Sequence, residues 1–160
     1  MKIVYTTNAG SSKKYAEMLS SKLACEALSL EETESAGGEE IIYIGWVMAG
    51  TIQGLAQARE NLGELKAVCA VGMMPGEKQK EELIAKNAVK EEFFLLPGDF
   101  HIDKLKGMYK MMMGMMMKML KSKLKESDDP KAKEAAELFE KGFDAVKEEN
   151  LEPVYEWLGV

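Results

Sequence analysis

The stretch Lys2-Ile3-Val4-Tyr5-Thr6-Thr7-Asn8-Ala9-Gly10-Ser11-Ser12 near the start of the chain decides the fold. Its first part, residues 3–6, is short, β-branched and aromatic, which is typical of a strand. Residues 7–10 are turn-prone, and the hydrophobic period becomes helical from Ser11 or Ser12, either of which suits a helix cap. The stretch therefore predicts a strand, a tight loop and a helix in direct succession.

The same alternation continues for about the first hundred residues. Alternating apolar and polar residues predict a short edge strand at 26–30, and apolar runs predict strands at 41–44, 67–71 and 92–96. Helical periods predict helices from Thr51 to Leu62 and over 77–88. Strands that alternate with helices favour a parallel sheet covered by helices on both faces, with right-handed crossovers. We therefore expect an α/β fold with a five-stranded parallel sheet.

The remaining third of the chain departs from this rhythm. A long helix is expected from about Asp103 to Lys125, a break at 127–130, and a last helix over 131–149, with Asp129 as its cap and Pro130 in its first turn. We expect a single domain over residues 1–160 with a Met-rich helical insertion at about 103–125. Lysines interrupt its only long apolar stretch, so no transmembrane segment is expected.

Composition narrows the function classes. The chain has 160 residues, 46% of them hydrophobic and 30% charged, which fits one globular domain. The net charge of −6 argues against nucleic-acid binding, which needs an excess of Lys and Arg. Cys25 and Cys69 have no metal-binding or redox spacing, so reduced thiols and a cytoplasmic location are expected. The first residues enter a strand pattern directly and do not resemble a signal peptide.

Ligands of open parallel sheets bind beyond the carboxyl ends of the strands, which directs attention to loops 7–12, 45–51 and 72–76. The first loop opens a helix, so its backbone N–H groups and the positive helix end can hold a phosphate. Thr7, Asn8, Ser11 and Ser12 add side-chain donors. No lysine occupies the Walker position, which disfavours nucleotide triphosphate hydrolysis. Ordinary turn and cap chemistry is the alternative interpretation of this loop.

Residues 3–16 resemble the opening of flavodoxin-like domains, in which a loop of the type [TS]-x-[TS]-G-x-[TS] binds the FMN phosphate. Thr7, Gly10 and Ser12 match this pattern, whereas Ala9 replaces the usual hydroxyl residue and removes one donor. Residues 44–52 are similar to the family stretch beside the isoalloxazine ring. The resemblance implies a three-layer sandwich with strand order 2-1-3-4-5 and FMN as the cofactor.

The residues that the resemblance places around FMN come from all three loops. They are Thr6, Thr7, Asn8, Ala9, Gly10, Ser11 and Ser12, then Gly45, Trp46, Val47, Met48, Ala49, Gly50 and Thr51, and finally Gly72, Met73 and Met74. Trp46 is the candidate for stacking on the flavin, with a core tryptophan as the alternative. Because no acidic residue occurs from Gly45 to Thr51, we expect a less negative low-potential couple than in classical flavodoxins.

Within the family, the end of the fifth strand and the following Lys/Met-rich helix look most similar to the group of menaquinone-dependent protoporphyrinogen oxidase. This resemblance implies an FMN-binding electron-transfer protein as the first hypothesis. A flavin-dependent oxidoreductase of the protoporphyrinogen oxidase type is the second. A flavin-free binding module with the same fold is the third, because Ala9 departs from the motif.

Eight of the twelve residues from Met108 to Met119 are methionine. Helical periodicity predicts one apolar face, opposite a face that collects lysines. The predicted apolar face consists of Leu105, Met108, Tyr109, Met112, Met116, Met119 and Leu120. Three interpretations of this helix, within residues 104–125, are open. It packs on its own domain, or it forms a surface for a redox partner protein, a quinone, a tetrapyrrole or a membrane periphery. The third interpretation is that it binds a soft metal.

His101, the only histidine, follows the fifth expected strand. An exposed or capping histidine and a flavin donor or acid–base group are the two interpretations. The chain shows no Ser-His-Asp or Cys-His pattern and no metal-ligand pairing, so hydrolase and metalloenzyme functions have little support.

Overall fold

The computed structural model describes residues 1–33, 38–73 and 75–160. The chain forms two compact units. The first contains residues 1–98 and 146–160, and the second contains residues 99–145. The second unit is therefore an insertion that begins near the expected position and continues beyond residue 125.

The first unit is built on a parallel sheet with the strand order β2-β1-β3-β5-β6. A two-residue strand, β4, pairs antiparallel with the end of β3. Apart from β4, this is the predicted order 2-1-3-4-5, so the flavodoxin-like α/β fold is confirmed. The strands are β1 (Lys2–Tyr5), β2 (Glu26–Ser29), β3 (Ile41–Met48), β4 (Thr51–Ile52), β5 (Leu65–Gly72) and β6 (Glu92–Pro97).

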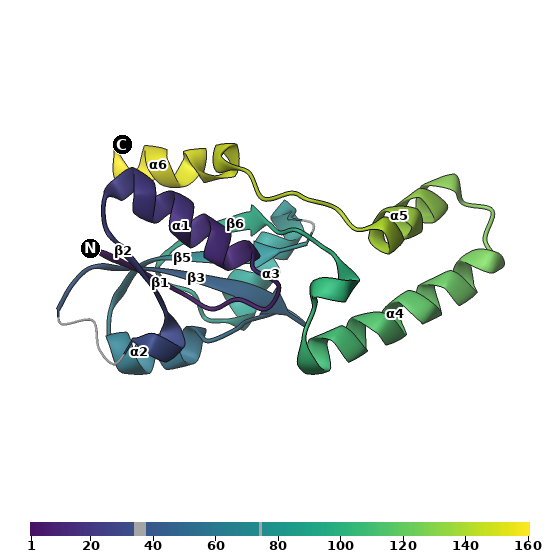
Figure 1. The fold of residues 1–160 in the computed structure, drawn as a ribbon, viewed down its shortest axis with the longest axis horizontal. Helices are drawn as coiled ribbons and strands as arrows, with labels where there is room; N and C mark the ends of the chain where they lie inside the picture. The colour runs from purple at the N-terminus through teal and green to yellow at the C-terminus, as the bar shows by residue number, and fades with distance from the viewer. Residues whose placement is uncertain (34–37, 74) are drawn as a thin grey trace. The chain divides into compact units, whose positions relative to one another are not determined.

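Helices cover both faces of this sheet, as Figure 1 shows. On one face lie α1 (Ser11–Leu23) and α6 (Glu152–Leu158), and on the other lie α2 (Leu55–Leu62) and α3 (Glu77–Lys86). Two short 3-10 helices, η1 (Leu30–Glu32) and η3 (Glu148–Leu151), complete the unit. The result is the expected three-layer sandwich.

The alternation of side chains along the strands divides the core into two layers. Ile42 and Ile44 of β3 point toward α1 and α6, whereas Ile41 and Tyr43 point toward α2 and α3. All four are completely buried. A central strand covered on both faces needs such a continuous apolar run, which is why the sequence pattern identified it.

Beyond Ile44 the structure differs from the sequence-based expectation. β3 does not end at Gly45 but continues to Met48, turns at Ala49 and Gly50, and returns as β4. Thr51 belongs to β4 and does not cap a helix, because α2 begins at Leu55 after Gly54. The expected loop at 45–51 is therefore a β-hairpin with a two-residue turn.

The second unit contains a short 3-10 helix, η2 (Ile102–Lys104), and the helices α4 (Gly107–Lys125) and α5 (Pro130–Lys141). Asp129 caps α5 by accepting from the Lys131 N–H, as predicted. The predicted last helix over 131–149 is wrong, because α5 ends at Gly142 with φ +78° and α6 is a separate element. In the described part of the chain, no helix is long and apolar enough to span a bilayer.

Candidate functional site

The first candidate loop joins β1 to α1 at the carboxyl edge of the sheet. The Thr6 N–H donates to the Ile44 carbonyl and so extends the pairing of β1 with β3 by one residue. The Gly10 N–H then donates to the Thr7 hydroxyl over 3.0 Å, which closes a tight turn. Gly10 has φ +104°, and no atom lies within 4 Å of the position of a Cβ there. The turn therefore faces open space at Gly10.

The amino end of α1 is prepared for an anion. Gly10 occupies the N-cap position and has no side chain with which to cap the first turn. The Ser12 side chain in this turn is completely buried, and its hydroxyl has no hydrogen-bond partner among the described residues. Because an unsatisfied buried hydroxyl costs about 1–3 kcal/mol, an oxygen supplied by a ligand would remove that cost. This observation fits a phosphate at the turn.

Thr6 was expected to bind the cofactor, but its hydroxyl forms hydrogen bonds within the protein. Its Oγ1 donates to the Gln53 carbonyl at 2.8 Å and lies 3.0 Å from the Tyr43 hydroxyl, which also reaches that carbonyl at 2.6 Å. Burial raises the pKa of Tyr43 to about 12, so this hydroxyl keeps its proton. The three groups connect β1 and β3 to the segment before α2, and they leave only the Thr6 backbone to the candidate site.

The end of β3 separates the expected ring-binding residues into two sets. By strand alternation, Trp46 and Met48 follow Ile44 on the α1 face, where the first loop begins its helix. Val47 packs against the opposite core layer. A Cβ on Gly45 would meet Ile52 at 2.7 Å, so this glycine allows β4 to fold back. Trp46, which is half-buried, and Met48 are therefore the members that share a face with the turn between β1 and α1.

The hairpin turn at Ala49 and Gly50 is held by the end of α3. The Lys86 ammonium donates to the Ala49 carbonyl at 2.6 Å, and the Asn87 amide donates to the Gly50 carbonyl at 3.0 Å. The Asn87 side-chain oxygen accepts from the Ile52 N–H at 2.9 Å. Thr51 at the start of β4 is exposed. A lysine at the end of α3 thus contacts this turn.

The third candidate loop begins at Gly72, the last residue of β5. The Gly98 N–H donates to the Gly72 carbonyl at 2.7 Å, and a Cβ on Gly98 would lie 3.6 Å from the Ser11 hydroxyl. Close to Gly72 lies Gln79 of α3, whose side-chain oxygen is buried and has no partner in the part of the chain that the structure describes. Met73 is half-buried, and the predicted contribution of Met74 lies outside the described residues.

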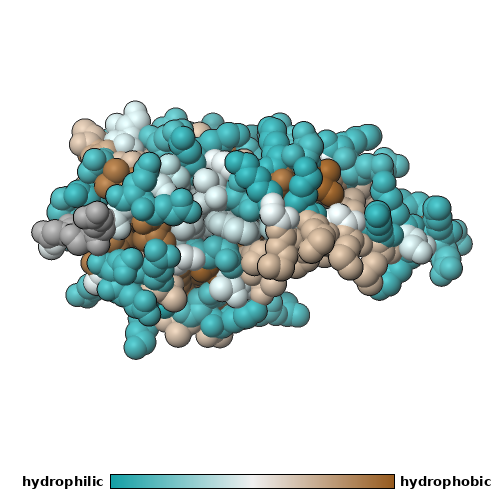
Figure 2. Space-filling model, turned by 60° about the horizontal axis from the view of Figure 1, so that its bottom comes forward, coloured by the Kyte–Doolittle hydropathy of each residue, from teal (hydrophilic) through white to brown (hydrophobic). Residues whose placement is uncertain are grey.

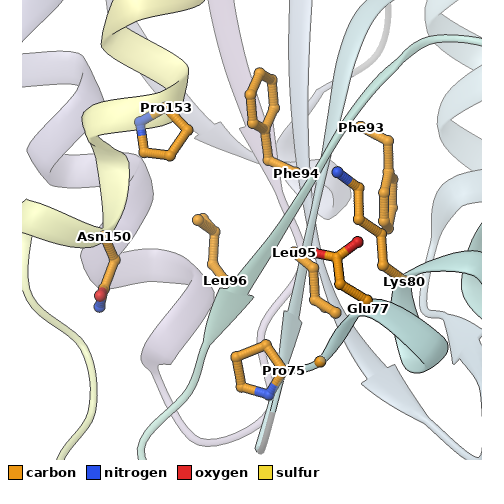
Figure 3. Close-up of a pocket in the computed structure, with 10 residues that line it drawn as sticks. Pro75, Glu77, Lys80, Phe93, Phe94, Leu95, Leu96, Asn150 and Pro153 are labelled. Carbon is orange, nitrogen blue, oxygen red and sulfur yellow. The ribbon is translucent and has the colours of Figure 1, made fainter.

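A groove beside the outer strand β6 is a separate feature, shown in Figure 3. Its volume is about 220 Å³, which is below the usual range of about 300–1,000 Å³ for pockets of small-molecule ligands. Residues of β6 form its floor, with side chains from α3 and α6 on its two sides. We therefore do not assign the flavin to this groove. Its lining residues are Pro75, Gly76, Glu77, Lys80, Phe93, Phe94, Leu95, Leu96, Asn150 and Pro153.

His101 lies in the second unit, where its side chain contacts a carboxylate. Its Nε2 lies 2.9 Å from a carboxylate oxygen of Asp144, and a Cβ on Gly142 would collide with the imidazole ring. His101 is half-buried and occupies the N-cap position of η2, although its side chain makes no capping hydrogen bond there. The pair is part of the structure that closes the ends of this unit.

By strand alternation, Trp46 and Met48 lie on the sheet face that carries the turn of Thr7 to Ser12, whereas Thr6, Gly45 and Val47 contribute to the fold. Sequence reasoning missed Gln79, Lys86 and Gly98. Gly98 had a signal, because a Pro-Gly pair ends the strand, but Gln79 and Lys86 lie on a helix whose orientation only the tertiary structure gives.

The sequence of the chain is similar to that of a known protein family. A family model described as a flavodoxin domain matches residues 2–127, which is most of the chain. No curated protein and no solved structure matches this chain. The matched region includes the turn between β1 and α1, the β3–β4 hairpin and all strands of the sheet. The chain belongs to the flavodoxin domain family.

Proposed function

We propose that the protein binds FMN at the carboxyl edge of its sheet and transfers electrons. The observation that carries this proposal is the buried hydroxyl of Ser12, which lacks a partner within the described residues and lies in the first turn of a helix without a side-chain cap. The N–H groups of this turn and the Thr7 hydroxyl would hold the phosphate, since a hydroxyl that accepts one bond can still donate.

Trp46 and Met48 would flank the flavin, because they lie on the same face of β3 as the phosphate turn. Their aromatic and thioether groups suit a flat apolar ring. The bound flavin supplies the redox chemistry, and the protein positions it and sets its surroundings.

The composition of the three loops favours electron transfer over the oxidoreductase alternative. The stretches 7–12, 45–51 and 72–76 contain no His, Asp or Glu that would move protons to or from a substrate. Assaying the flavin-loaded protein for protoporphyrinogen oxidation tests this choice. Turnover of that substrate would favour the oxidoreductase of the protoporphyrinogen oxidase type.

The phosphate assignment is tested by comparing FMN with riboflavin, which lacks the phosphate. We expect a yellow complex with FMN and clearly weaker binding of riboflavin, measured by fluorescence quenching or calorimetry. The Ser12→Ala variant should lose about tenfold or more in FMN affinity, because hydrogen bonds to charged groups contribute about 1.5–3 kcal/mol. Its riboflavin affinity should not change.

Ser21→Ala is the matched control, because Ser21 is exposed on the same helix. This variant should bind FMN like the wild type. A protein that stays colourless with FMN would contradict the proposal and favour a flavin-free binding module. Equal affinities for FMN and riboflavin would contradict the role of the turn.

A further inference from the structure

Six methionines of α4 are exposed and form what we call the methionine face. Their side chains are 37–75% accessible, whereas most large apolar residues of the chain are buried. Figure 2 shows this face as a light-brown surface bordered by hydrophilic residues. The methionine face consists of Met108, Met111, Met112, Met115, Met116 and Met119.

This face is not the side of α4 that the fold buries. Tyr109, Met113 and Met117 are the buried residues of the helix, and they recur every four residues on one stripe. The predicted apolar face is therefore only partly covered, because Met108, Met112, Met116 and Met119 remain accessible. An exposed apolar surface of this kind usually marks a site of interaction.

The charged residues of α4 itself all have one sign. Helix α4 carries five lysines and no acidic residue, although the whole chain has a net charge of −6. At 100° per residue, Lys118 and Lys125 border the face on one side and Lys123 on the other. All three are exposed. The surface is therefore complementary to a partner that is apolar inside and anionic at its border.

We propose that the methionine face docks α4 on an anionic lipid bilayer. A membrane surface offers both properties, and an amphipathic basic helix lies in its interface with the apolar side inward. The accessible methionines lie along a single helix. Because methionine side chains are flexible, they can pack against an apolar surface that has no fixed shape. α4 contains no Arg or Trp, and its Tyr109 is buried, so it lacks the residues that dominate protein–protein interfaces. This inference does not depend on flavin binding.

Flotation with vesicles tests the proposal on the full-length protein. We expect binding to vesicles of phosphatidylcholine with phosphatidylglycerol and little binding to phosphatidylcholine alone. Replacing Met108, Met111, Met115 and Met119 by Ser should weaken partitioning at least about tenfold, because burial of each side chain favours the membrane. The same four positions changed to Leu should retain binding.

Lysine variants test the charge separately. Lys118, Lys123 and Lys125 changed to Gln should weaken partitioning about 100-fold, since each basic residue near an anionic surface contributes about 1 kcal/mol, or about fivefold. The matched control changes three exposed lysines of the first unit, Lys13, Lys78 and Lys147, to Gln and should bind almost normally.

Three outcomes would overturn the proposal. The first is no binding of the wild type to anionic vesicles. The second is binding that the lysine variants lose but the Met→Ser variant keeps, which would show simple electrostatic adsorption. The third is self-association of the wild type in sedimentation velocity that the Met→Ser variant abolishes, which would assign the face to a second copy of the chain. Circular dichroism melting should show that each variant is folded.

Discussion

Arg59 of α2 and Glu91, just before β6, are joined by two hydrogen bonds of 2.8 Å, from Nε to Oε1 and from Nη2 to Oε2. Arg59 also donates to the carbonyls of Asn87 and Ala88 at the end of α3. One guanidinium therefore connects α2 to the segment between α3 and β6. Such a two-pronged pair is stronger than an ordinary surface ion pair.

This pair should make stability depend on acid. The Arg59 hydrogen bonds lower the pKa of Glu91 to about 2. A lowered pKa means that the stabilisation is complete above the pKa of the unfolded chain, about 4.3, and is lost as the pH falls toward 2. We expect Glu91→Gln to lower the unfolding free energy by about 1–3 kcal/mol at pH 7, measured by urea denaturation, and by much less at pH 2.5.

Glu82→Gln is the control for this prediction, because Glu82 forms only an exposed pair with Lys78 at 3.9 Å. Its effect should stay below about 0.5 kcal/mol. Equal effects of the two substitutions at pH 7 would show that the Arg59 pair contributes nothing special.

Gly54 and Gly63 flank α2. Substituting each of them by Ala allows the cost of backbone strain to be compared with the cost of steric overlap. Both have positive φ, +78° and +80°, but a Cβ on Gly54 would collide with the Tyr43 hydroxyl, whereas nothing lies within 4 Å of that position on Gly63. Gly63→Ala should cost about 1–3 kcal/mol for backbone strain alone, because its φ of +80° with ψ of −133° is a combination that residues other than glycine rarely adopt. Gly54→Ala should cost at least about 2 kcal/mol more, because it overpacks the Thr6–Tyr43–Gln53 cluster. Thermal melts that show equal losses would contradict this assignment.

Ala9 is the position where the phosphate motif is incomplete, and restoring the hydroxyl should strengthen FMN binding. Ala9 is not among the residues with positive φ, so a larger side chain fits its backbone. Under the proposed function, Ala9→Thr should raise FMN affinity about five- to tenfold and leave riboflavin affinity unchanged. Ala9→Val has the same shape without the hydroxyl, and an equal gain there would exclude the hydrogen bond as the cause.

The two thiols should differ in reactivity although both are free. Cys69 lies in β5 and is completely buried, and burial raises its pKa to about 12. Cys25 is half-buried, and desolvation also raises its pKa, but less of its surface is covered. Because the thiolate is the reactive form, an alkylating reagent at pH 8 should label Cys25 slowly and Cys69 only after unfolding. Mass spectrometry of native protein labelled mainly at Cys69 would contradict the buried position.

Oxidation should distinguish the two sides of α4. Met108 is 75% accessible, whereas Met113 is 2% and Met117 is 6% accessible. A limited dose of hydrogen peroxide should therefore convert Met108, Met111, Met115 and Met119 to sulfoxides first, as peptide mapping would show. Oxidation of Met113 at the same rate in the folded protein would mean that the methionine face is wrongly placed.

The sequence predicted the sheet well because buried parallel strands have a simple pattern. The run Ile41–Ile44 is apolar throughout and stops visibly at glycine. The β3–β4 hairpin was not predicted because its turn residues are Ala49 and Gly50, with Ala49 at φ +50°. Two-residue hairpin turns are usually recognised in a sequence by an Asn-Gly or Asp-Gly pair. The Thr51 hydroxyl then resembled a helix cap.

The candidate site was predictable where it depends on local chemistry. The turn after β1 needed only the spacing of Thr7, Gly10 and Ser12. The direction of Thr6, the contribution of Gln79 and the covered side of α4 depend on partners that are distant in the sequence. Periodicity showed that α4 is amphipathic, but only its tertiary contacts determine that Met113 is buried and Met116 is accessible.

The ends of the second unit are fastened to each other by its own hydrogen bonds. Phe100 and Phe143 exchange two backbone hydrogen bonds of 2.8 Å, and the Ala145 N–H donates to the Asp99 carboxylate at 2.7 Å. Because the two ends of this segment lie side by side, the distance that it spans between β6 and residue 146 does not depend on its length. Insertions or deletions within this segment should therefore leave the strand order of the first unit's sheet unchanged.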